Sequence, residues 1–147
     1  MIRSIAAVIV SYITMFVLNI LGFFALYTIV GASHAFKPRS FLASNRWILM
    51  GVAVMFLSAV IAGLICAAIA RGGKAAVGLA ALILVVGLLI AIPAMNKARA
   101  NAGMVRVGDV SLAEAMEKAY WPVWAPFTFP FISAVGALLG ANLKKRG

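Results

Sequence analysis

The side chains that could transfer a proton are few, and they lie outside the long apolar segments of the chain. They are one histidine and three carboxylates: His34, Asp109, Glu114 and Glu117. General acid–base catalysis needs such a group within hydrogen-bond reach of the reacting atoms. We expect the carboxylates to cap and solubilise a short helix and the lone histidine to be solvated. The sequence therefore favours a protein that is not an enzyme, and a membrane enzyme using these loop residues is the least favoured alternative.

Hydroxyl and thiol groups do occur inside the apolar segments, as at Ser58, Ser133 and Cys66, but no Asp, Glu, Lys, Arg or His lies within any of these segments. A serine or cysteine nucleophile needs a base in reach. Ionisable groups in lipid mark ion-coupled transporters, proton relays and voltage sensors, so these classes are disfavoured. A single histidine excludes haem held by paired histidines, and no metal-ligand spacing is present. We expect no cofactor and no metal.

Two polar residues of the first apolar segment could line a binding site. Tyr12 and Asn19 share nearly the same helical face, and Asn19 lies near the middle of the segment. One interpretation is a hydrogen bond between helices, worth about 0.6 kcal/mol on average in membranes. The other is a polar lining for a solute or quinone pocket. We favour the first, because one asparagine with a few hydroxyls is common where membrane helices meet.

Composition indicates that most of this chain is surrounded by lipid. Of the 147 residues 65% are hydrophobic and 11% are charged, with a mean hydropathy of +1.11, whereas a soluble domain has about 25% charged residues. The formal net charge is +10. Basic residues scattered at the ends of apolar segments are typical of contacts with anionic headgroups, while nucleic-acid binding needs a clustered basic face. We expect an integral, multi-pass protein of a bacterial inner membrane or a similar membrane, with lipids as partners and no nucleic acid.

Four apolar segments are long enough to cross a bilayer of about 30 Å as helices: 4–30, 47–70, 75–93 and 122–143. The first exceeds the about 7–15 apolar residues of a signal peptide, so we expect it to be retained as an anchor. Ser44 or Asn45 should cap the second span. Ser111 and Glu114 have capping-box spacing and predict an amphipathic helix over 111–120. The fold class is therefore an all-α membrane protein, a single domain of four transmembrane helices with a short amphipathic helix before the fourth.

Prolines mark the expected limits of the last two spans. Pro93 should end or kink the third span, because proline lacks the N–H that continues a helix. The fourth span should begin at Pro122 and bend at Pro126 and Pro130. A helix that began only after Pro130 would keep about 13 residues, roughly 20 Å, which is too short to cross.

Small residues recur every four positions along the second and fourth spans. In lipid, close backbone approach at such faces supplies the packing that the hydrophobic effect supplies in water. The second span has two adjacent stripes of this kind, so it can accept a neighbour on each and should lie at the centre of the bundle. The predicted packing residues are Ser58, Ala59, Ala62, Gly63, Cys66, Ala67, Gly136 and Gly140.

The basic residues are nearly balanced between the two membrane faces. Six flank the termini and the hairpin at 71–74, and seven flank the two longer loops. The compact basic tail and hairpin favour cytoplasmic termini under the positive-inside rule. The predicted headgroup contacts are Lys37, Arg39, Arg46, Arg71, Lys74, Lys144, Lys145 and Arg146.

Three functional classes fit these features. The favoured one is a non-catalytic accessory or scaffold subunit of a larger membrane complex, for example a respiratory or photosynthetic one, whose partners are other integral membrane subunits or a second copy of the chain. The alternative is a small transporter, channel or lipid-handling protein that uses the region of Asn19. The third is the membrane enzyme mentioned above. The absence of ionisable groups from the spans sets this order.

Overall fold

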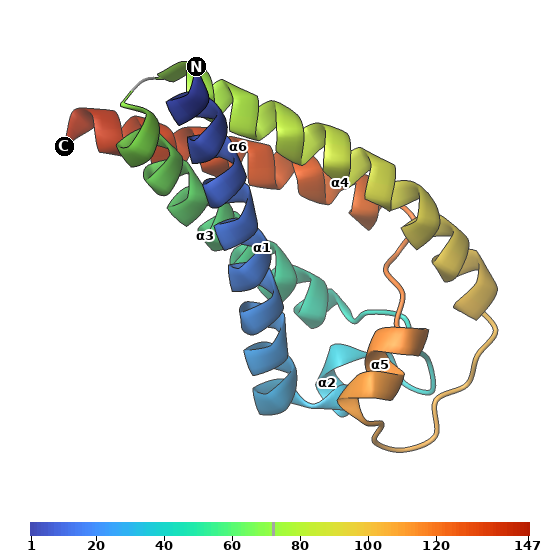
Figure 1. Cartoon of the computed structure of the whole chain (residues 1–147). Coiled ribbons are helices and arrows are strands. Elements are labelled where there is room, and N and C mark those ends of the chain that lie inside the picture. Colours follow the sequence, from blue (N-terminus) through green and yellow to red (C-terminus); the bar gives the residue numbers. More distant parts are fainter. Residues whose placement is uncertain (72) are drawn as a thin grey trace.

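The computed structural model describes residues 1–71 and 73–147. Within these residues the regular elements are all helices (Figure 1). Four helices are long and apolar enough to cross a membrane, which makes the chain an all-α, multi-pass membrane protein. They are α1 (Ile2–Val30), α3 (Asn45–Ala70), α4 (Gly73–Asn101) and α6 (Ala125–Arg146). Two short helices, α2 (Ala32–Ala35) and α5 (Leu112–Lys118), lie in the connections.

The four long helices pack as a chain of neighbours. The most extensive pair is α3 with α6; α1 packs on α3, and α4 packs on α6. Smaller contacts join α4 to α1 and to α3, so α3 touches each of the other three long helices. Figure 1 shows both termini and the start of α4 at one end of the molecule, with α2 and α5 at the other. Toward that second end α1 and α4 diverge.

A layer of loops, which we call the loop layer, closes the second end of the molecule. It joins residues 31–44 to residues 102–124 through backbone pairing. The backbone N–H of Ala43 donates to the carbonyl of Tyr120 at 3.0 Å, and the N–H of Tyr120 donates to Phe41 at 3.1 Å. The N–H of Arg106 donates to Arg39 at 3.2 Å. Apolar side chains bury this layer against the bundle, with Phe41 only 2% exposed.

The caps expected from the sequence are present. The hydroxyl of Ser44 accepts the N–H of Trp47 at the start of α3, and the hydroxyl of Ser111 accepts the N–H of Glu114 at the start of α5. Gly31 ends α1 with a φ of 72°, a conformation that glycine adopts without steric cost.

Two helix limits differ from the sequence prediction. Helix α4 continues through Pro93 to Asn101, since the residues after the proline are mostly alanine, lysine and arginine, which are strong helix formers. Helix α6 begins at Ala125 rather than at Pro122. A start at Pro122 would put two later prolines in the helix interior, whereas a start at Ala125 places Pro126 in the first turn, where no N–H is needed. Only Pro130 then lies inside the helix. The short helix α2 was not predicted.

Candidate functional site

The predicted packing residues of α3 and α6 are all buried inside the chain. A Cβ added at Gly63 would overlap the backbone of Ala137, and one at Gly140 would overlap the backbone of Val60. Helices α3 and α6 therefore meet backbone to backbone. The second small-residue stripe of α3, which contains Cys66, faces α1. Cys66 belongs to the same buried cluster as Ala7 of α1. These faces pack helices of one chain together and leave no free surface there for a partner.

Two of the proton-transfer candidates of the loops, Glu114 and His34, have local hydrogen-bond partners in the structure. Glu114 accepts a hydrogen bond from Lys118 at 2.9 Å, one helical turn further along α5. The hydrogen bond and charge of Glu114 raise the pKa of Lys118. The Nδ1 atom of His34 lies 3.2 Å from the carbonyl of Val30. Among the described residues, no group of three His, Cys, Asp or Glu side chains could hold a metal ion.

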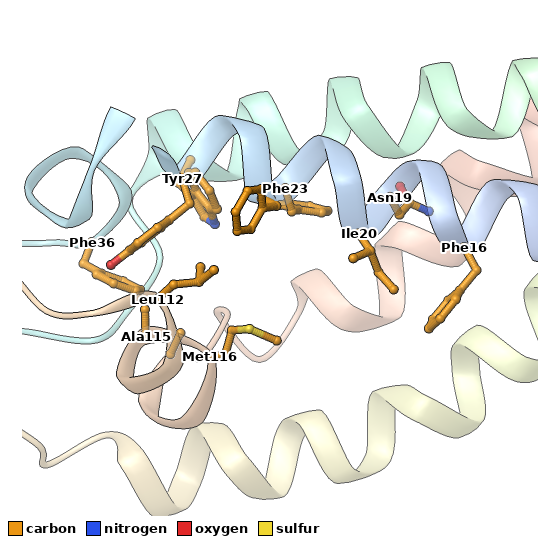
Figure 2. A pocket seen from close by; sticks show the side chains of 12 residues that line it. Phe16, Asn19, Ile20, Phe23, Tyr27, Phe36, Leu112, Ala115 and Met116 are labelled. Carbon is orange, nitrogen blue, oxygen red and sulfur yellow. The ribbon is translucent and has the colours of Figure 1, made fainter. Parts of the chain in front are cut away.

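A cavity of about 320 Å³, which we call the lateral pocket, lies between α1 and the loop layer. Figure 2 shows side chains of α1 on one side and Leu112 and Met116 of α5 opposite. On α1 the exposed fractions of Phe16, Ile20 and Phe24 are 56%, 53% and 52%, so this wall opens to the outside of the bundle. The remaining lining includes the buried rings of Phe36 and Trp47, whereas Met116 of α5 is 70% exposed. The twelve lining residues are Phe16, Asn19, Ile20, Phe23, Phe24, Tyr27, Phe36, Trp47, Leu112, Ala115, Met116 and Ala119.

A second cavity of about 270 Å³ adjoins the lateral pocket and shares Phe16 and Asn19 with it. Tyr12 and Ser133 also line this second cavity, among residues of α4 and α6. The structure thus brings Tyr12 and Asn19 to one cavity.

The hydrogen bond between helices that we expected for Asn19 is absent among the described residues. Its side-chain oxygen Oδ1 is buried and has no hydrogen-bond partner. Many of the side chains across the second cavity are apolar, including Ile90 and Ala91 of α4, and cannot donate to it. An unpaired amide oxygen in an apolar surrounding is costly, so Asn19 is a place where a ligand could supply the missing donor.

Helix α5 is held over the lateral pocket by the end of α4. The ammonium group of Lys97 donates to the carbonyl of Met116 at 2.7 Å, and the amide of Asn101 donates to the carbonyl of Lys118 at 2.9 Å. These bonds satisfy carbonyls at the C-terminal end of α5. From α1, the hydroxyl of Tyr27 donates to the backbone carbonyl of Val110 at 3.0 Å, just before the start of α5. The continuation of α4 beyond Pro93 is what brings Lys97 and Asn101 within reach.

Trp47 joins the pocket wall to the bundle. Its ring lies 5.8 Å from the ring of Phe23 and 6.2 Å from that of Tyr27, measured between centroids. Its exposed fraction is 8%. In the sequence Trp47 is the first residue of the second predicted span, and its place two residues after the start of α3 is the signal that could have indicated packing under the loop layer.

The predicted headgroup contacts are all exposed, but they are not equivalent. Arg71, Lys144 and Lys145 surround a single cavity where α3 and α6 end. Lys74 lines another cavity together with Ser4 near the start of α1. Three others, Lys37, Arg39 and Arg46, belong to the loop layer and the start of α3.

The fold and these cavities define a class: a helical membrane protein of four spans with an apolar pocket open at its side. Comparisons of the chain with protein-family models, with curated proteins and with solved structures found no significant match. The function of the chain therefore has to be inferred from its own geometry.

Proposed function

We propose that this protein is a non-catalytic lipid-handling membrane protein that takes one long apolar chain from the bilayer into its lateral pocket. The observation that carries this proposal is the pocket itself: about 320 Å³ of space bounded almost wholly by apolar side chains. Ligand sites in proteins have volumes of about 300–1,000 Å³ and mostly apolar walls. Because four spans place the chain in a membrane, lipid chains are the apolar molecules that surround this opening.

The dimensions of the pocket suit a lipid chain. Along α1 it extends from Phe16 to Tyr27, which is about 16 Å at the rise of an α-helix. That length is about half of a hydrocarbon core of about 30 Å. One acyl chain of a lipid in the leaflet next to the loop layer therefore matches the pocket in length.

Asn19 gives the pocket its polar specificity. The amide lies at the inner end of the lateral pocket, where the second cavity begins. Its unpaired Oδ1 requires a donor, and a hydroxyl on the ligand would supply one. The ligand class is therefore a long-chain lipid with a small hydroxyl-bearing group, such as a fatty alcohol or a quinol.

The test uses Trp47 as the reporter, in the full chain with Trp121→Phe and Trp124→Phe. The probe is a long-chain alcohol brominated at mid-chain, since bromine quenches indole fluorescence at contact. We expect saturable quenching, and weaker binding of the corresponding methyl ether. Asn19→Leu should remove the difference between alcohol and ether, a loss of roughly threefold to fivefold for one hydrogen bond.

A matched pair of variants separates the pocket from unspecific partition into detergent. Ala119→Phe fills the lateral pocket, whereas Ala113→Phe adds the same ring to the exposed side of α5. The first should reduce the affinity for the alcohol by tenfold or more, and the second should leave it unchanged. Equal quenching in both variants, with both folded by circular dichroism, would exclude the lateral pocket as a lipid site.

The accessory-subunit function is the second candidate, and the weak burial of α1 favours it. Only 17% of the most apolar stretch of α1 is buried, against 50% in α6. Large apolar side chains such as Ile5, Ile9 and Ile13 remain exposed along it, as on a helix that packs against another subunit. Gentle extraction from native membranes should then give stoichiometric migration with larger integral subunits, and Ile9→Trp with Ile13→Trp should disrupt it. Migration of the wild-type chain alone would exclude this function.

A further inference from the structure

The ends of α3 and α6 form a cavity with three positive charges around it. Arg71 follows α3, and Lys144 and Lys145 lie in the last turn of α6. Together with Ala67 and Ala68 they line a cavity of about 490 Å³. This basic pocket lies at the end of the molecule that holds both termini (Figure 1), whereas the lateral pocket lies toward the loop layer. The basic pocket and the lateral pocket share no lining residue.

No acidic side chain in the described part of the chain pairs with these three charges. The acidic side chains of this protein are Asp109, Glu114 and Glu117, and all of them belong to the segment around α5, at the opposite end of the molecule. No described hydrogen bond or ion pair engages the side chains of Arg71, Lys144 and Lys145. Arg3 at the same end differs, because its Nε donates to the carbonyl of Ile69 at 2.6 Å.

The wall of the basic pocket combines charge with a small apolar surface. Ala67 is 8% exposed and belongs to a cluster of alanines with Ala76 and Ala141, and Ala68 beside it is exposed. Alanine leaves room beneath the long basic side chains. A ligand for such a site has an anionic group at the membrane surface and an apolar part directly below it.

We propose that the basic pocket binds the phosphate of one anionic phospholipid, with the start of its acyl chains on Ala67 and Ala68. Basic pockets between spans at one membrane face bind anionic headgroups in this way. Arginine and lysine differ in how they hold phosphate: Arg71 can offer two parallel N–H donors, while the lysines act as point charges. This site is independent of the lateral pocket and goes beyond the lipid-handling function proposed above.

Native mass spectrometry of the delipidated full chain tests this proposal with two probes that have the same chains, phosphatidylglycerol and phosphatidylcholine. We expect one phosphatidylglycerol to bind with an affinity at least tenfold higher than that of phosphatidylcholine. Lys144→Gln and Lys145→Gln should each weaken phosphatidylglycerol binding about fivefold, the contribution of one basic residue at a membrane surface. Equal binding of the two lipids would overturn the proposal.

The matched control is Arg146→Gln, which removes the same charge from the same helix end but does not line the cavity. It should change the affinity less than twofold; a loss equal to that of Lys144→Gln would mean unspecific attraction and would overturn the site. Inorganic phosphate is the third probe. If it displaces phosphatidylglycerol at equal concentration, the site binds free anions and the lipid assignment is wrong.

Discussion

At the scale of single residues, two glycines determine how closely α3 and α6 approach. Gly63 lies against the backbone of Ala137, and Gly140 lies against the backbone of Val60, with no side chain between the helices. Lipid tails compete equally well for apolar surfaces, so membrane helices associate through van der Waals contact at small residues. A single added methyl group at this contact has nowhere to go, because the opposing atoms are backbone.

We therefore predict that Gly63→Ala destabilises the bundle although alanine is the better helix former. The overpacked contact should cost about 1–3 kcal/mol, measured as the free energy of unfolding in a denaturing-detergent titration. Gly78→Ala is the matched control, since its added Cβ would meet only Val8 at 3.7 Å, an ordinary contact. It should be neutral or slightly stabilising. Equal stability of the two variants would show that α3 and α6 are further apart than described.

At the scale of the elements, the sequence predicted the spans well because apolar composition alone defines them. It also narrowed the cap of α3 to Ser44 or Asn45 and located that of α5 at Ser111; in both caps the hydrogen bond joins residues three positions apart. The end of α4 and the start of α6 were misjudged because the cost of a proline depends on its position in the helix. Pro93 lacks one hydrogen bond in a long, otherwise favourable helix, and Pro126 lies where none is required.

The lateral pocket was beyond sequence reasoning for a different reason. The capping-box spacing of Ser111 and Glu114 predicted an amphipathic helix here, but not what its apolar face would meet. Its position depends on long-range bonds, from Lys97 at the end of α4 and from Tyr27 of α1. Asn19 was identified from its type and place in the first span. Its lack of a hydrogen-bond partner depends on which side chains the other helices bring to the second cavity, which no local pattern encodes.

At the scale of the whole molecule, the two ends are chemically distinct. Both ends have basic side chains in nearly equal number, but all three acidic side chains lie toward the loop layer. The lateral pocket lies in the half of the molecule next to the loop layer, and the basic pocket lies at the opposite end. A phospholipid at one and a long-chain ligand at the other would therefore occupy different leaflets and would not compete for space.

This arrangement predicts that residues 103 and 146 face opposite sides of the membrane. The native Cys66 is fully buried, and Cys66→Ala provides a background without thiols. In it we place one cysteine by Gly103→Cys, where a new side chain meets no other atom within 4 Å, or by Arg146→Cys at the exposed end of α6. Given cytoplasmic termini, a membrane-impermeant maleimide should label the cysteine at position 103 in intact cells and the cysteine at position 146 only after permeabilisation.

The reverse pattern would keep the four-span fold and invert its orientation. Labelling of both from outside would mean that α6 does not cross the membrane, because the loop layer and the C-terminal end of α6 would then share one face.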